Sequence, residues 1–89
     1  MSILSFEQDA FEDFFDWGVY DKRRFAKIHD LLKAILRDPF NGPGKPEPLK
    51  GNLKGCWSRR IDDKHRLVYR VATNGDIEIL SCKWHYDDK

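Results

Sequence analysis

Glu47 lies between Pro46 and Pro48, a setting in which a carboxylate could do chemistry. Proline fixes its own φ angle and restricts the residue before it, so the backbone around Glu47 is stiff. A carboxylate on a stiff backbone can be aimed at a substrate at little entropic cost. An exposed loop glutamate is the more common fate of this residue type, so the two prolines alone leave both interpretations open.

Arg66, Lys83 and His85 carry the second set of functional groups. Arginine can bind a phosphate through two parallel N–H groups. Histidine has an ordinary pKa of about 6.5, which suits a proton donor at neutral pH. The alternatives are a surface arginine that contacts the next strand and a half-exposed histidine at a frayed strand end.

Three predicted strands, over residues 56–61, 65–71 and 77–84, must position these groups. Asn74–Gly75 predicts a two-residue hairpin loop, which places Thr73 opposite Asp76. That register puts Arg66 opposite Lys83 and diagonal to His85 on one face of the sheet. On the other face it places Leu67, Tyr69, Val71, Leu80, Cys82 and Trp84.

The first half of the chain has helical periodicity. Ser5 is a candidate N-cap for a helix whose apolar stripe covers residues 10–18, after a short strand at residues 3–6. Asp21 can cap a second helix that runs to about residue 37 and ends before Pro39. A loop with all four prolines follows. We predict one α+β domain over residues 1–89, with a helical hairpin packed on an antiparallel sheet.

Charge and composition narrow the function classes. The first 21 residues carry six acidic side chains and no basic one, whereas residues 45–70 carry eight basic against three acidic. A basic stripe is what a phosphate-binding surface would have, although a solvated mixed-charge surface fits equally well. No apolar run reaches the ~18 residues of a membrane-spanning helix, and no secretory signal is apparent. We expect a cytoplasmic protein.

A zinc site is the main alternative use of the cysteines. Cys56, Cys82 and His85 offer three candidate ligands, without a second closely spaced pair. Because this is a weak signal for zinc, we reject it and expect no metal or other cofactor.

Four motifs in a fixed order carry a resemblance to a known family. They are Gly44-Lys45-Pro46-Glu47-Pro48-Leu49-Lys50, Trp57-Ser58-Arg59-Arg60-Ile61, His65-Arg66-Leu67-Val68-Tyr69 and His85-Tyr86. Together they resemble the YoeB (Txe) branch of the RelE/ParE toxin superfamily, over nearly the whole chain. The resemblance implies a RelE-like, microbial-ribonuclease-like fold. It also implies a ribosome-dependent mRNA endoribonuclease of a type II toxin–antitoxin system.

The resemblance assigns Glu47 as the base, His85 as the acid and Arg66 as the group that stabilises charge. Residue chemistry agrees, because metal-free RNA cleavage needs a base for the ribose 2′-OH, an acid for the leaving oxygen and a cation for the phosphorane. The expected RNA-binding residues are Lys50, Arg59, Arg60, Lys83 and Tyr86.

The implied partners are mRNA, the ribosome and a YefM/Phd-like antitoxin, which would wrap the basic face with an acidic segment that folds on binding. Exposed aromatic side chains would favour a homodimer, and we expect no membrane partner. Two alternatives stay open. The same superfamily fold serves toxins that inhibit DNA gyrase without cutting RNA, and an inactive relative could still bind the antitoxin. Neither needs the set Glu47, Arg66 and His85.

Overall fold

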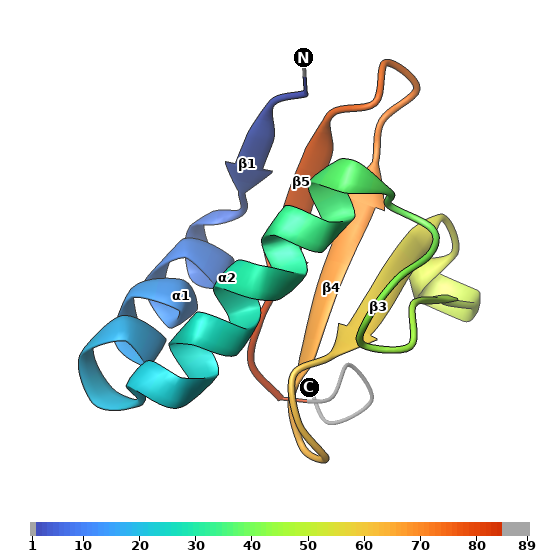
Figure 1. The fold of residues 1–89 in the computed structure, drawn as a ribbon. Helices are drawn as coiled ribbons and strands as arrows, with labels where there is room; N and C mark the ends of the chain where they lie inside the picture. Colours follow the sequence, from blue (N-terminus) through green and yellow to red (C-terminus); the bar gives the residue numbers. More distant parts are fainter. Residues whose placement is uncertain (1, 85–89) are drawn as a thin grey trace.

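The computed structural model describes residues 2–84. Two helices pack on one face of a five-stranded sheet with the strand order β1-β5-β4-β3-β2 (Figure 1). The elements are β1 (Leu4–Phe6), α1 (Gln8–Tyr20), α2 (Lys22–Arg37), β2 (Glu47–Pro48), a 3₁₀ turn (Gly51–Leu53), β3 (Cys56–Arg60), β4 (Arg66–Val71) and β5 (Ile77–Ser81). The predicted α+β class is confirmed. The sheet is mixed, because β1 pairs with β5 in parallel.

The helices form the predicted antiparallel hairpin (Figure 1). Asp21 caps α2, since its carboxylate accepts the backbone N–H of Arg24 at 3.1 Å. The predicted N-cap Ser5 is wrong: Ser5 lies in β1 opposite Glu78, and Glu7 precedes α1 without a side-chain cap. Pairing with β5 keeps the chain extended past Ser5, so the helix begins later than the capping pattern predicted.

The main core lies between the helices and the sheet. Ile28 and Leu31 of α2 pack there with Tyr69 of β4 and Ile79 of β5. A smaller cluster on the other side of the sheet contains Leu49, Cys56 and Val68, with Leu53 and Leu80 against it. We call this second side the open face. Because side chains alternate along a strand, it carries Cys56, Ser58, Arg60, Arg66, Val68 and Arg70 of β3 and β4.

The hairpin between β4 and β5 corrects the predicted register. Gly75 donates its N–H to the Ala72 carbonyl, and Ala72 donates to Asp76, so the loop has three residues instead of two. Gly75 has a φ of +93°, the left-handed position typical of such loops. Near the loop every pair is therefore shifted by one residue, with Val71 opposite Ile77.

A bulge between Val68 and Tyr69 returns the next pair, Val68 with Ser81, to the predicted register. Leu80 consequently lies on the open face, against the prediction, whereas Cys82 reaches the helix-side core as predicted. The strand β5 ends at Ser81, three residues earlier than expected. Within residues 2–84, neither helix is long and apolar enough to cross a membrane.

Candidate functional site

The open face contains a cavity of about 260 Å³ beside β2. Its lining residues are Lys45, Glu47, Ser58, Arg60 and Arg66. The structure therefore brings together three residues predicted from the sequence, one carboxylate and two guanidinium groups. Lys45 adds a third cation, so the site is strongly basic and suited to an anionic ligand.

Backbone pairing places Glu47 at this cavity. Glu47 lies opposite Ser58 in the β2–β3 ladder. Three residues earlier, the Gly44 carbonyl accepts the Arg60 N–H at 2.7 Å. Gly44 has a φ of +87°, and a Cβ there would lie 2.9 Å from Leu31, so a side chain at this position would be strained. Contacts with β3, in addition to the two prolines, thus hold the loop that carries Glu47.

Arg60 and Arg66 are directly opposite each other in the β3–β4 ladder. Like charges in such a position repel, which makes the pair unfavourable unless an anion lies between them. Arg66 is 8% exposed, so its charge lies in a partly desolvated setting. The expected neighbour of Arg66 was Lys83. Arg66 instead donates its backbone N–H to the Trp84 carbonyl at 3.0 Å, and Arg60 supplies the adjacent charge.

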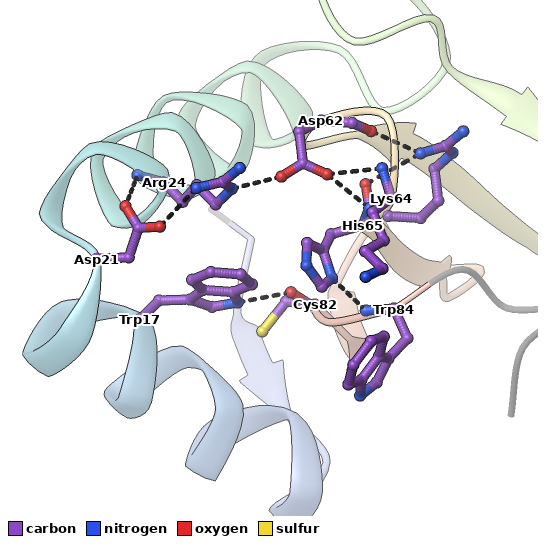
Figure 2. A network of polar contacts seen from close by, with 9 residues as sticks. Trp17, Asp21, Arg24, Asp62, Lys64, His65, Cys82 and Trp84 are labelled. Atoms are coloured by element: carbon purple, nitrogen blue, oxygen red, sulfur yellow. Dashed lines mark hydrogen bonds and ion pairs between the residues drawn. The ribbon is translucent and has the colours of Figure 1, made fainter.

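The turn at residues 62–65 holds the Arg66 side chain. Arg66 Nη1 donates to the Asp62 carbonyl at 2.7 Å and to the His65 carbonyl at 3.2 Å. The Asp62 carboxylate accepts the backbone N–H groups of Lys64 at 2.8 Å and His65 at 2.7 Å. It also pairs with Arg24 of α2 (Figure 2). The turn is therefore fastened to the helix layer.

The electrostatics of Asp62 follow from these contacts. Partial burial alone would raise the pKa of its carboxyl, but Arg24 and the two backbone N–H groups outweigh it and lower the pKa to about 2. Asp62 is thus a stable anion that anchors the turn and, through its carbonyl, the Arg66 guanidinium.

Arg59 does not fit its predicted contact with RNA, because its side chain is fully buried. The donors Nε, Nη1 and Nη2 reach the Tyr69 hydroxyl and the carbonyls of Pro43, Asp38 and Asn41 at 2.7–3.2 Å. Strand alternation explains this, since Arg59 faces the helix side while its neighbour Arg60 faces the open side. Arg59 holds the proline loop in place.

Two other predicted residues, Lys50 and Lys83, are not among the residues that line the cavity. Lys50 is exposed at the start of the 3₁₀ turn. Lys83 is half-buried, with Nζ 5.9 Å from the centre of the Trp84 ring. His85 and Tyr86 lie outside the described residues, so their predicted roles stay predictions.

Sequence reasoning missed Lys45, Ser58 and Asp62 as contributors to the site. Ser58 could have been found, because it lies two residues before Arg60 on the same strand and therefore on the same face. The position of Lys45 depends on a loop with a φ of 51° at that residue, which the sequence does not indicate. Cys56 and Cys82 belong to clusters on opposite sides of the sheet, so they do not converge on a common metal site.

Known proteins resemble this chain over nearly its whole length. The chain is 50% identical to the toxin YoeB of Mycobacterium bovis, over 97% of this chain and 100% of that protein. It is 48% identical to the toxin YoeB of Escherichia coli, over 93% and 98%.

Among solved structures, a YoeB/ParE toxin from Agrobacterium tumefaciens superposes with a TM-score of 0.91 at 44% identity, covering 94% of this chain and 99% of that one. A YoeB–YefM complex from Staphylococcus aureus gives 0.87 at 47% identity, over 97% and 99%. A YoeB dimer from the same organism gives 0.87 at 48%, over 96% and 98%. The family model for the YoeB-like toxin of bacterial type II toxin–antitoxin systems matches residues 6–86. By sequence and fold, the chain belongs to this family of toxins.

Proposed function

We propose that this toxin is a ribosome-dependent endoribonuclease that cuts mRNA without a metal ion. The observation that carries the proposal is the cavity that Glu47 lines together with the cross-strand pair Arg60 and Arg66. A carboxylate beside paired guanidinium groups suits a reaction in which a proton leaves a hydroxyl and negative charge grows on a phosphate.

In the proposed reaction, Glu47 takes the proton from a ribose 2′-OH, and the freed oxygen attacks the adjacent phosphorus. Arg66 and Arg60 stabilise the phosphorane charge. The bond from phosphorus to the 5′-oxygen then breaks, and His85 gives that oxygen a proton. The products are a 2′,3′-cyclic phosphate and a free 5′-hydroxyl. No water or redox partner is consumed.

The dependence on the ribosome has a physical reason. The cavity is small, and Glu47, one of its lining residues, is exposed, so the toxin alone offers little surface to hold and bend an RNA strand. Aligning the 2′-oxygen with the scissile bond accounts for a large part of the activation barrier. If the ribosome already holds the RNA in that alignment, the toxin has to supply only the catalytic groups.

The proposed partners follow from the relatives. The Staphylococcus aureus relative has been solved both with YefM and as a dimer. We expect a YefM-like antitoxin here as well, with an acidic segment that covers the basic open face. Exposed Phe11, Phe15 and Val19 recur every four residues along α1 and offer an apolar surface for a protein partner.

Primer extension on a translated mRNA, with and without ribosomes, tests the proposal. The wild type should cut only with ribosomes, and Glu47→Gln should lower the rate by about 10²–10⁴-fold. The matched control is Glu12→Gln, which changes an exposed glutamate of α1 and should cut normally. Equal growth arrest by the wild type, Glu47→Gln and His85→Ala would reject the nuclease and favour an inhibitor that works by binding.

A further inference from the structure

Lys45 is a cation of the cavity to which the proposed reaction gives no role. It lines the cavity two residues before Glu47, and its side chain is exposed. None of the ion pairs within residues 2–84 includes Lys45. The positive charge of Lys45 is therefore available to an anionic ligand that enters the cavity.

The backbone of Lys45 has an unusual conformation for its residue type. Its φ is 51°, in the left-handed region. There the Cβ of an L-residue comes close to the next carbonyl oxygen, a contact that only glycine avoids. Pro46 follows directly and narrows the conformations open to the residue before it. A lysine at this position thus destabilises the loop, and strained residues of this kind cluster at functional sites.

Contacts with β3 on both sides of Lys45 enforce this conformation. Before it, the Gly44 carbonyl accepts the Arg60 N–H at 2.7 Å. After it, Glu47 lies opposite Ser58 in the β2–β3 ladder. The chain has to turn between these two contacts, and the left-handed residue makes that turn. Lys45 is therefore fixed at the cavity by its neighbours on either side.

The charge of the cavity leaves room for a second anionic group. Its lining carries three cations, Lys45, Arg60 and Arg66, against the single carboxylate of Glu47. One phosphodiester brings one negative charge, so the scissile phosphate alone does not balance this excess of positive charge. An RNA strand offers further phosphates along its backbone, and lysine binds phosphate as a point charge.

We propose that Lys45 is a further substrate-binding residue, whose ammonium group contacts an RNA phosphate in the cavity, and that the destabilising left-handed backbone persists because it holds Lys45 there. The proposal rests on the proposed function, in which the ligand is RNA. A point-charge contact is present both before the reaction and in the transition state. Its loss should therefore raise KM and leave kcat nearly unchanged.

Three substitutions separate the charge of Lys45 from its backbone. Lys45→Gln removes the charge and keeps a long side chain, and Lys45→Arg keeps the charge. Lys45→Gly removes the charge and also relieves the left-handed strain. The matched control is Lys33→Gln, which removes the charge of an exposed lysine on α2.

The first measurement is the affinity of the full chain for a 2′-O-methyl oligouridine, which cannot be cut because its 2′-oxygen is blocked. Fluorescence anisotropy at several salt concentrations gives the slope of log Kd against log salt. Loss of one phosphate contact on a single strand lowers this slope by about 0.7. We expect that change, and an affinity about two- to fivefold weaker, for Lys45→Gln and Lys45→Gly. Lys45→Arg and Lys33→Gln should behave like the wild type.

The second measurement is thermal unfolding without RNA. Lys45→Gly should raise the melting temperature by about 2–5 °C, because glycine adopts the left-handed conformation without strain. Lys45→Gln and Lys45→Arg keep that strain and should melt close to the wild type. If Lys45 served only to stabilise the loop, Lys45→Gly would melt lower. In the RNA-cleavage assay with ribosomes, Lys45→Gln should raise KM with little change in kcat.

The outcomes separate the two proposals. A wild-type salt slope in Lys45→Gln, or no binding of the oligouridine by the wild type, would overturn the phosphate contact, and a wild type that still cuts RNA would leave the nuclease standing. A lowered slope in a toxin that cuts no RNA would overturn the nuclease and keep the contact. A lower melting temperature in Lys45→Gly would overturn the part of the proposal that concerns strain.

Discussion

Arg59 and Arg60 are adjacent in the sequence but belong to different environments. Arg60 lines the cavity on the open face, whereas Arg59 is buried on the helix side and donates hydrogen bonds to the proline loop. A count of basic residues does not distinguish the two. Side chains alternate along β3, and this alternation makes Arg60 available to a ligand and gives Arg59 a structural role.

Arg59→Met should destabilise the fold, because it leaves the Tyr69 hydroxyl and the loop carbonyls of Asp38 and Asn41 without their donor. We expect a loss of about 2–3 kcal/mol in the free energy of unfolding, measured by urea denaturation. Arg60→Met, on the exposed side of the same strand, should change stability by less than about 0.5 kcal/mol while slowing RNA cleavage. Equal stability of the two variants would contradict the assignment of Arg59.

Among the elements, the 62–65 turn connects most of the site. Asp62 ties it to α2, its carbonyl holds Arg66, and His65 reaches Trp84. The strands predicted over residues 56–61 and 65–71 imply a turn here, but its contacts were not predicted, because they join residues up to 38 positions apart in sequence.

The lowered pKa of Asp62 predicts a pH-dependent stability. A carboxyl whose folded pKa is about 2, below the ordinary 3.8, stabilises the protein fully above about pH 5 and loses this contribution as the pH falls toward 2. Allowing for solvent screening, the contribution is about 1–2 kcal/mol. Urea unfolding at pH 7, 5 and 3 should show a shallower decline for Asp62→Asn than for the wild type. Asp63→Asn, in the same turn, is the control and should decline like the wild type.

The helices were predictable because their signals are local. Asp21 caps α2 as predicted, and the apolar period of that helix buries Ile28, Leu31, Leu32 and Ile35. The hairpin register was not, because Asn74–Gly75 suits both two- and three-residue loops and the bulge at Val68 leaves no mark in the sequence. Nor does local sequence reveal that β1 pairs with β5, whose partners lie more than 70 residues apart.

For the molecule as a whole, the two sides of the sheet differ in their part in stability. Ile79 is fully buried in the core beneath the helices, and its neighbour Leu80 is half-buried on the open face. The grouping of Glu47 with Arg66 was predictable through the family motifs, whereas the identity of the second arginine depended on which side each residue of β3 faces.

Ile79→Ala should therefore lower the free energy of unfolding by about 2–5 kcal/mol, as for other large buried side chains. Leu80→Ala should lower it by about 1 kcal/mol, because Leu80 packs only against the smaller cluster. Thermal or urea unfolding of the two variants measures the contrast. A larger loss for Leu80→Ala would indicate the two-residue hairpin and its opposite assignment of faces.

The parallel pairing of β1 with β5 has a consequence for synthesis. The N-terminal strand has no partner until residues 77–81 have been made, since Leu4–Phe6 bonds only to that strand within the described sheet. Such long-range pairing closes late, because a large loop must be ordered first. A nascent chain of this toxin therefore stays incompletely folded while most of it is being translated. The ribosome, which is the proposed site of action, completes β5 before the toxin can fold.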